Sequence, residues 1–437
     1  MPTLTFPLSR IEGHASVEIE VREGHILSTR FKATEMRGFT YLVQGVPAEQ
    51  MPVIVPRICG VCSTAHHVAA VKTLEDAYGI TPPPLARQIR SLLLLGQMLQ
   101  NQATSLFIFT MPDRLGVDSL FHVSEEEAGR ETQFNIARRA LQVRLLGTDL
   151  ISLAGGQFIH PVKAVVGGVS SGILPEKAEA MRQKLQEMLP VACELFDFYW
   201  QMSVKMKERI GSWGDDAPAH YITSIRAEKP DYDSDEIRVL APEGVCCQTF
   251  TPQHFREHLT FEETDYSFAG RTSYLGQVMR ANSLARANMT QRMGTPYADQ
   301  YLKYVFDTFG RPAHPILLFD LCRGVELVYT IERAIEILSE PLDRQDTSLP
   351  YTPRDGEGYG LVEAPRGPLI HHYVVEGGHI TSGEFIIPTV HNMLAIERAL
   401  RVAAERYITS DSVNMELEKA VGRVVRAFDP CIACATH

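Results

Sequence analysis

The sequence predicts an α+β fold that is predominantly helical, with a large central helix bundle and small peripheral β-sheets. Long segments with apolar residues at helical spacing dominate the 437 residues, and β-type alternation is confined to a few short segments. A third observation concerns two Cys-x-x-Cys pairs near opposite ends of the chain. They are 369 positions apart, counted from Cys62 to Cys431. If these pairs share one metal ion, the N- and C-terminal segments converge on a buried metal site.

The helix bundle is predicted from the longest apolar segments. Residues 85–109 are apolar on most helical faces, and a helix of this kind belongs in the centre of a bundle. Shorter or more polar helices are expected at residues 69–77, 124–149, 175–210, 276–310, 328–340, 393–406 and 414–427.

The β-structure is predicted in three places. Residues 1–50 form an N-terminal β segment, since residues 15–21 alternate apolar and polar positions before a turn at Glu23-Gly24. Residues 213–275 change to short β-branched runs with Pro, Asp and Gly, which predicts a β-rich excursion. Residues 371–375 are also strand-like and follow a rigid Pro-Arg-Gly loop.

Composition excludes several classes of protein. The chain is 45% hydrophobic and 22% charged, as is ordinary for a soluble globular protein. A formal charge of -11 argues against nucleic acid as a partner, because phosphate binding needs a basic surface. No apolar stretch approaches the roughly 18 residues of a spanning helix, and the start shows no signal peptide. We therefore expect a cytoplasmic or peripherally membrane-associated protein without a membrane span.

Three kinds of site compete for the paired cysteines. Four thiolates can hold a structural zinc ion, although zinc ribbons place their pairs roughly 15–20 residues apart. A disulfide pair and a catalytic soft-metal site are the alternatives. Opposite charges at Arg57 and Asp429, together with His66 and His437 shortly after the second cysteines, favour the catalytic site, because such groups tune bound thiolates.

The flanks carry a family resemblance. The motifs Arg-x-Cys-Gly-x-Cys-x-x-x-His from residue 57 and Asp-Pro-Cys-x-x-Cys-x-x-His from residue 429 resemble the large, catalytic subunit of nickel–iron hydrogenases. Further similarity extends over essentially the whole chain, so we expect residues 1–437 to form one interlocked domain that ends in a metal-binding motif at 428–437. A related subunit of respiratory complexes has lost these cysteines, which disfavours that alternative.

The resemblance implies a nickel–iron centre. Its ligands would be Cys59 and Cys431 as terminal nickel ligands and Cys62 and Cys434 as bridges to iron, and the iron would carry cyanide and carbon monoxide. The loop at Pro388 and Thr389 resembles the segment that cradles those diatomic ligands.

The resemblance also implies roles in proton transfer. Glu12, in Arg-Ile-Glu-Gly-His, would be the proton gate, and Arg366 would lie over the open metal position. We favour the Cys431 thiolate as the first base, because arginine almost always stays protonated. His66 would donate to the Cys62 sulfur. Asp113 is either a Pro-Asp turn or an aspartate near the open face of the metal.

An accessory ion is in doubt. The family commonly has a glutamate at the position of Thr40, where the carboxylate helps to hold a magnesium-type ion beside the terminal histidine, His437. A neutral hydroxyl lowers the favourable charge, because such ions prefer anionic oxygen ligands. Water or Glu35 would have to replace the missing ligand.

The partners follow from the same resemblance. Dihydrogen would be the substrate, and electrons would pass to a separate iron–sulfur small subunit. The cysteines outside the pairs are scattered, which is poor geometry for a cluster; we expect them to be buried hydrophobic residues, at Cys193, Cys246, Cys247 and Cys322. A maturation endopeptidase would cut the precursor after the terminal histidine, and the chain looks like the processed form.

Overall fold

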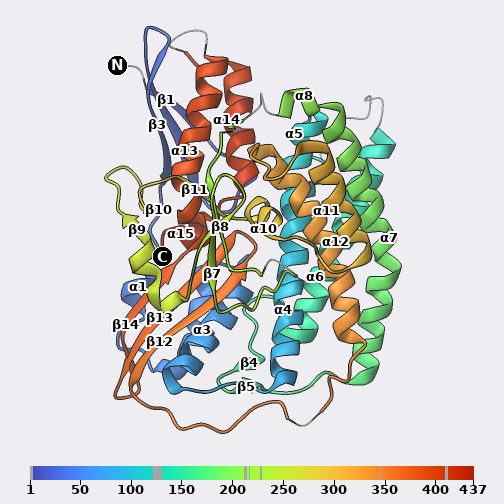
Figure 1. The fold of residues 1–437 in the computed structure, drawn as a ribbon, viewed down its shortest axis with the longest axis vertical. Coiled ribbons are helices and arrows are strands. Elements are labelled where there is room, and N and C mark those ends of the chain that lie inside the picture. Colours follow the sequence, from blue (N-terminus) through green and yellow to red (C-terminus); the bar gives the residue numbers. More distant parts are fainter. Residues whose placement is uncertain are drawn as a thin grey trace.

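The structure is a computed structural model that describes residues 3–121, 130–210, 214–215, 217–226, 229–344, 346–408 and 412–437. A layer of long helices occupies one side of the molecule in Figure 1, and the other side combines small sheets with shorter helices. The prediction of a predominantly helical α+β fold is confirmed. The helical layer contains α4 (Pro84–Ala103), α6 (Arg130–Gly155), α7 (Pro175–Lys205), α11 (Pro296–Phe309) and α12 (Phe319–Leu338).

Helix α4 lies at the centre, as its apolar sequence predicts. It starts with Pro84 in the first turn, where a missing backbone N–H costs nothing, and it packs against α6 and α12. After Ala103 the chain continues through one π-helical segment, η3 (Thr104–Thr110), and into α5 (Met111–Leu115). The helix expected at 85–109 is therefore extended by a π-helical irregularity rather than ended by a turn.

The other half of the molecule is built on two three-stranded antiparallel sheets. One has the order β1-β2-β3, which confirms the N-terminal hairpin, and the other has the order β12-β13-β14. Their strands are β1 (Thr3–Pro7), β2 (Ala15–Arg22), β3 (His25–Ala33), β12 (Gly356–Ala364), β13 (Gly367–Glu376) and β14 (His379–Ile386). The helices of this half are α1 (Phe39–Leu42), α2 (Met51–Ile54), α3 (Ser63–Tyr78), α13 (Pro388–Tyr407), α14 (Met415–Phe428) and α15 (Ile432–Ala435).

The β-rich excursion lies where it was expected. Strands β6, β7 and β8 form a four-stranded sheet with β11, and β9 pairs with β10. The bounds are β6 (His220–Thr223), β7 (Ile237–Leu240), β8 (Cys246–Phe250), β9 (Leu259–Glu262), β10 (Arg271–Tyr274) and β11 (Met279–Arg280), with β4 (Ala164–Val165) and β5 (Gly168–Val169) forming a separate ribbon.

Several helix boundaries differ from expectation. The single helix expected at 276–310 is divided into α10 (Ser283–Met289) and α11, because Gly294 and Pro296 separate them. Helix α12 begins nine residues before the expected 328, and the segment expected at 175–210 is α7 followed by α8 (Lys207–Ile210). Part of the helix expected at 124–149 lies outside the described residues.

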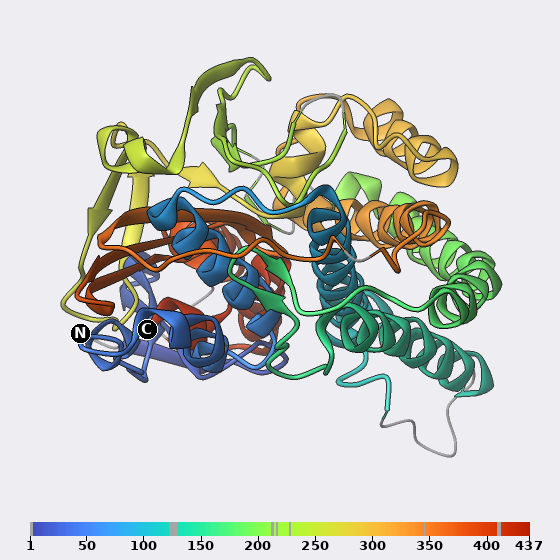
Figure 2. The ribbon, with the colours of Figure 1, turned by 90° about the horizontal axis from the view of Figure 1, so that it is seen from below.

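The two chain ends meet beside helix α3. Figure 2 shows the blue N-terminal and red C-terminal segments close together under the β12-β13-β14 sheet. Residues Glu12 and Cys431 form an isolated parallel β-bridge there. Helix α3 packs against β12 at two glycines, since a Cβ on Gly358 would lie 2.6 Å from Ala77 N and one on Gly360 would lie 2.7 Å from Thr73 N. These glycines let the helix lie directly on the sheet.

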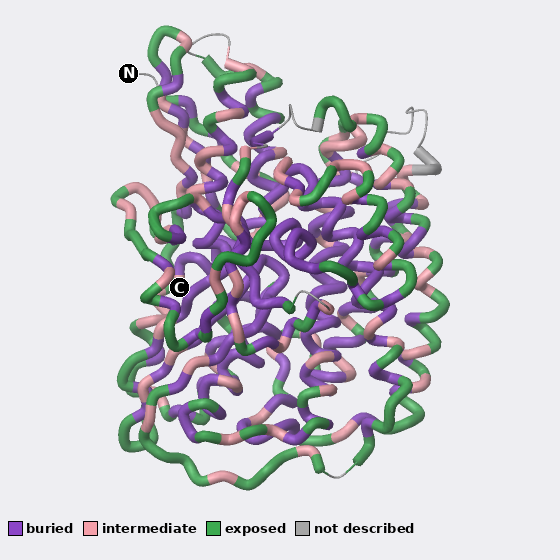
Figure 3. The backbone as a smooth tube through the Cα atoms, viewed as in Figure 1, coloured by how far each residue is buried: buried purple, intermediate pink, exposed green. Residues whose placement is uncertain are grey.

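Figure 3 shows that burial is densest where the two halves of the molecule meet. Two of the four remaining cysteines, Cys193 and Cys322, are buried as expected. The expectation is wrong for Cys246 and Cys247, which are exposed because they lie in β8 next to a β-bulge. No helix within the described ranges is long and apolar enough to cross a membrane.

Candidate metal centre

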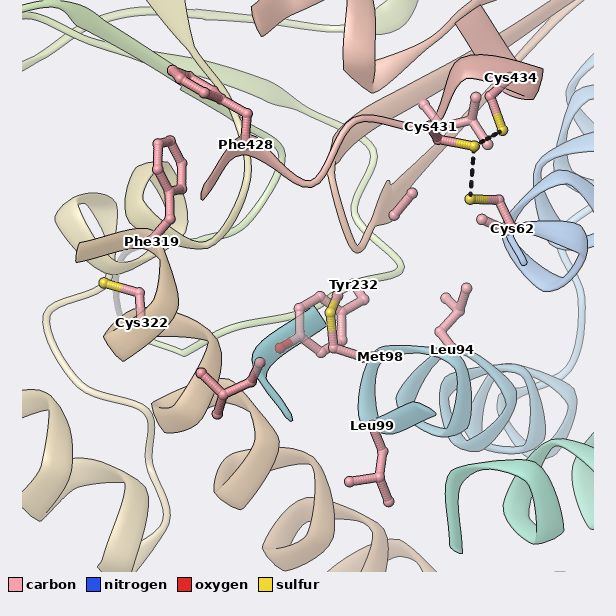
Figure 4. Packing of buried hydrophobic residues seen from close by; sticks show 14 of the residues in the cluster. Cys62, Leu94, Met98, Leu99, Tyr232, Phe319, Cys322, Phe428, Cys431 and Cys434 are labelled. Carbon is pink, nitrogen blue, oxygen red and sulfur yellow. Dashed lines mark hydrogen bonds between the residues drawn. The ribbon is translucent and has the colours of Figure 1, made fainter. Parts of the chain in front are cut away.

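The four paired cysteines converge on one point. Their sulfur atoms all lie within 4.8 Å of one another, and all four residues are buried. The Cys431 Sγ is 3.3 Å from Cys59 Sγ, 3.7 Å from Cys62 Sγ and 3.0 Å from Cys434 Sγ. Figure 4 shows three of these sulfurs turned toward one another. A disulfide needs about 2.05 Å, so these thiols are arranged as a ligand set.

Each pair surrounds a turn that enters a helix. Cys59 is extended (φ -150°) at the end of the 3₁₀ helix η2 (Val55–Ile58), and Cys62 caps the start of α3. At the other end of the chain, Cys431 precedes α15 and Cys434 lies in it. Two intervening residues therefore bring both thiols of each pair to the same side, as metal-binding pairs require.

The C-terminal pair is held in place by backbone contacts from distant segments. Helix α14 ends at Phe428, and Asp429 takes a left-handed conformation (φ 49°) that reverses the chain. The Ile432 N–H then donates to the Glu12 carbonyl at 3.1 Å, and the Cys431 N–H donates to Thr389 Oγ1 at 3.0 Å. Thr389 is thus a partner of the C-terminal pair at the start of α13, where Pro388 occupies the first helical position.

Arg366 joins the two cysteine pairs electrostatically. Its Nη1 donates to Cys62 Sγ at 3.1 Å, and its Nη2 donates to Asp429 Oδ1 at 3.0 Å. Burial opposes the charged guanidinium, but Asp429 and the thiols raise the pKa of Arg366 well above its ordinary value. Side-chain hydrogen bonds with Cys431 and Cys434 hold the pKa of Cys62 well below its ordinary value, and the Arg366 charge acts in the same direction.

Asn101 is a residue that sequence reasoning missed. Its Nδ2 donates to Asp429 Oδ2 at 3.0 Å, so Asp429 is held from both sides. Asn101 is 2% exposed in α4. A polar side chain in a segment expected to be buried on most faces was the available signal, because buried amides need partners.

Glu12 lies against the cluster. Its Oε2 accepts from the Ala433 N–H at 3.0 Å and from the Cys431 thiol at 3.0 Å. The following Gly13 has a φ of 81°, and a Cβ there would lie 2.8 Å from the Ile432 Cβ. The glycine therefore lets the Glu12 segment approach the C-terminal pair, and this carboxylate is the proton acceptor nearest to Cys431 among the contacts described.

The His66 ring has a different sulfur partner from the one expected. Its Nε2 lies 3.5 Å from Cys434 Sγ, in the C-terminal pair, rather than in hydrogen-bond contact with Cys62. Its Nδ1 lies 3.0 Å from His371 Nε2. Burial lowers the pKa of His66 to about 4, so the ring is neutral near pH 7.

Asp113 does not point at the thiols. Its Oδ1 accepts from Arg10 at 2.6 Å, and its two oxygens accept from Arg426 at 2.7 and 2.9 Å. It lies in α5 and is neither a helix-ending turn nor a neighbour of the cysteines in any contact described. The carboxylate is committed to two arginines because η3 and α5 continue the line of α4 and carry Asp113 beyond the cluster.

The terminal histidine lines a separate cavity. His437 Nδ1 lies 2.9 Å from the Cys434 carbonyl oxygen, which is consistent with donation from the ring. The cavity has a volume of about 710 Å³ and is also lined by Thr40, Glu263 and Glu384. Glu35 is exposed and is not among its lining residues. Within the described ranges, the four cysteines are the single group of His, Cys, Asp or Glu side chains that converges as metal ligands.

The fold and the four-thiol site define the class of this protein. The family model for nickel-dependent hydrogenases matches residues 37–135 and 225–437, which is most of the chain. The chain therefore belongs to the nickel-dependent hydrogenase family, and it is an oxidoreductase of the hydrogenase type.

Two relatives and one solved structure show how far the similarity extends. A subunit of the F420-non-reducing hydrogenase vhu of Methanococcus voltae is 32% identical, over 91% of this chain and 97% of its own. The beta subunit of the NAD-reducing hydrogenase HoxS of Cupriavidus necator is 28% identical, over 99% of this chain and 93% of its own. A crystal structure of an NAD⁺-reducing nickel–iron hydrogenase in the H₂-reduced state aligns over 100% of both chains with a TM-score of 0.93 and 26% identity.

The thiol cluster fits the metal that the family name implies. Four buried sulfurs form a soft donor set that suits nickel and iron. Burial raises the pKa values of Cys431 and Cys434 well above the ordinary value of a thiol, and a bound cation reverses this, because coordinating thiols are deprotonated. The donor chemistry and the geometry therefore agree.

Proposed function

We propose that this chain is the catalytic subunit of a nickel–iron hydrogenase that reversibly splits dihydrogen into protons and electrons. The observation that carries the proposal is one buried cluster of four thiols with a carboxylate, Glu12, on one flank and a guanidinium, Arg366, on the other. Dihydrogen is apolar and a very weak acid. Heterolytic cleavage therefore needs a Lewis acid and an adjacent base, and this arrangement supplies both.

The proposed ligand roles follow the four positions in the cluster. Cys59 and Cys431 would bind nickel as terminal ligands, and Cys62 and Cys434 would bridge to an iron that carries cyanide and carbon monoxide. When bound, such a centre supplies Lewis acidity and redox capacity. Pro388 and Thr389, at the start of α13, would line the side of the iron, and the Thr389 contact to the Cys431 backbone supports this placement.

The proposed proton route starts at the Cys431 thiolate and continues to Glu12. The 3.0 Å contact between Cys431 Sγ and Glu12 Oε2 is short enough for direct transfer. Because Glu12 also accepts the Ala433 N–H at 3.0 Å, its carboxylate is held in place for each transfer. Glu12 is partly exposed, so the proton would leave the cluster toward the surface.

Arg366 would act as electrostatic support rather than as a base. Its charge is fixed by Asp429, and its Nη1 lies against the Cys62 sulfur. Negative charge that develops on the thiolates during cleavage is stabilised by a nearby, already oriented cation. His66 would donate to Cys434 and lower the electron density on that sulfur.

Electrons would leave through an iron–sulfur small subunit. The relatives described above carry the names of subunits, and the described cysteines outside the cluster do not converge on a second metal site. A maturation endopeptidase would process the precursor after the terminal histidine, as the resemblance implies. The accessory ion beside His437 would be weaker or more hydrated than in relatives that have a glutamate at position 40.

Metal analysis with infrared spectroscopy tests the proposal. The protein, purified with its small subunit, is expected to contain about one nickel and about one iron per chain. It should also show infrared bands of metal-bound carbon monoxide and cyanide. Stoichiometric zinc without those bands would refute the assignment and return a structural metal site.

A pair of variants links the metals to the cluster. Cys434→Ser removes one of the four sulfurs, and we expect it to lose the bands and most of the nickel. Cys246→Ser changes an exposed thiol outside the cluster and is expected to keep both. Equal metal content in the two variants would contradict the proposed ligand set.

A further inference from the structure

A line of three buried side chains leads from the Cys434 sulfur into the β12-β13-β14 sheet. His66 Nε2 lies 3.5 Å from Cys434 Sγ, and His66 Nδ1 lies 3.0 Å from His371 Nε2. His371 Nδ1 then lies 2.7 Å from the Tyr373 hydroxyl. The three side chains are at most 1% exposed.

The strand periodicity places two members of this line on the same face. His371 and Tyr373 are two residues apart on β13, and alternate residues of a strand point to one side. His372 lies between them and faces outward, where it contacts Glu357 and Glu384. The inner face meets α3, which carries His66.

The packing around the line allows little rotation of the rings. Helix α3 lies directly on β12 at Gly358 and Gly360. The Phe385 ring meets His371 edge-on, with the centroids 4.9 Å apart. The hydroxyl of Thr73, which follows His66 on α3, lies 3.4 Å from the His371 carbonyl. The helix and the strand therefore hold the two imidazoles in one register.

The chemistry of the line favours one direction of donation. A neutral imidazole has one N–H and one acceptor nitrogen, and burial lowers the pKa values of both rings. The Tyr373 hydroxyl carries a proton, and among the described contacts its acceptor is His371 Nδ1. His371 must then carry its proton on Nε2 and donate it to His66 Nδ1. His66 in turn carries its proton on Nε2, which faces Cys434.

The opposite direction is unfavourable at both ends. It would turn the lone pair of His66 Nε2 toward the sulfur, and it would leave the buried Tyr373 O–H without the acceptor it has now. An unsatisfied buried polar group costs about 1–3 kcal/mol. Hydrogen bonds in such a chain also strengthen one another, so the hydroxyl at one end affects the bond to sulfur at the other.

We propose that Tyr373 and His371 are positioning residues that hold the His66 imidazole with its Nε2–H directed at the Cys434 sulfur, and thereby lower the electron density on that thiolate. The inference rests on the proposed function, since a metal-bound Cys434 thiolate is the acceptor. Neither residue touches the thiols in the contacts described, and both act through His66.

The first measurement is ¹⁵N NMR of histidine-labelled, metal-loaded protein in a diamagnetic state and in complex with its small subunit. His66→Leu and His371→Leu assign the two rings by difference. Both rings should be protonated on Nε2 in the unchanged protein. In Tyr373→Phe, the Nδ1 signal of His371 should move downfield, because that nitrogen loses its hydrogen bond. Protonation of His66 on Nδ1 in the unchanged protein would overturn the proposal.

The second measurement is the infrared band of metal-bound carbon monoxide, which reports electron density at the metal. It should move to lower wavenumber in Tyr373→Phe and further in His371→Leu, because the hydrogen bond to the sulfur weakens stepwise. Tyr329→Phe is the matched control, since Tyr329 is also buried and its hydroxyl donates to the Pro230 carbonyl at 2.7 Å, in the helical half of the molecule. It should lose a similar amount of stability and leave the band in place.

The two possible failures are distinguishable. A carbon monoxide band that is equally unshifted in Tyr373→Phe, His371→Leu and the Tyr329→Phe control would overturn the positioning role and leave the hydrogenase assignment intact. If the unchanged protein had no such band, the proposed centre would be wrong, and the histidine ¹⁵N signals would still decide the direction of the hydrogen bonds.

Discussion

Replacing the Glu12 carboxylate by an amide should stop proton transfer and leave the fold intact. Glu12 Oε2 contacts the Cys431 sulfur and the Ala433 N–H, each at 3.0 Å. In Glu12→Gln the side-chain carbonyl still accepts the Ala433 N–H, so the conformation is kept. The titratable oxygen is lost, and a positioned proton acceptor contributes roughly 10²–10⁴ in rate. This corresponds to about 3–5 kcal/mol in the activation barrier.

The assay compares two reactions of the same variant. Hydrogen-dependent dye reduction and H₂/D₂O exchange both need a proton to leave the cluster, and both should fall by about 10²–10⁴. Conversion between para- and ortho-hydrogen needs cleavage and recombination at the cluster, and it should be largely retained. Nickel content and the carbon monoxide band should be unchanged.

Two further variants sharpen the interpretation. Glu12→Asp shortens the side chain by one methylene, which withdraws the carboxylate from its 3.0 Å contact, so an intermediate loss is expected. Glu18→Gln is the control, since it removes a carboxylate six residues away that pairs with Lys32 on the sheet surface. It should cost at most about 1 kcal/mol in stability and no activity. Dye reduction by Glu12→Gln at a rate near that of the unchanged enzyme would refute the proposed route.

Three other expectations follow from the same geometry. Arg366→Lys keeps the charge and loses the planar fork that holds Asp429, so turnover should fall by about 10²–10³ with the metals retained; near-normal turnover would mean that charge alone is sufficient. Thr40→Glu adds a carboxylate to the cavity of His437 and should raise divalent-ion affinity, measured by calorimetry and elemental analysis; a fully occupied, carboxylate-bound ion in the unchanged protein would show the expectation for Thr40 to be wrong. Asn101→Ala leaves Asp429 Oδ2 without its buried donor and should destabilise the protein by about 1–3 kcal/mol in thermal unfolding, whereas a neutral effect would show that water replaces the amide.

The sequence alone determined the chemistry of the site. The spacing within each cysteine pair is a local property, and two intervening residues place both thiols at one turn whatever surrounds them. The apolar pattern of residues 85–109 likewise predicted the central helix α4, because a helix apolar on most faces has to be buried. The strand alternation of residues 15–21 predicted β2 for the same kind of reason.

Only the tertiary structure decided which distant groups touch. His66 contacts Cys434, 368 positions away, rather than the nearby Cys62, because α3 and the C-terminal segment cross at an angle that no local spacing encodes. Asp113 pairs with Arg10 and Arg426 instead of facing the thiols, because η3 and α5 extend the line of α4 past the cluster. Sequence periodicity specifies the faces of single elements, whereas contacts between elements depend on how those faces pack.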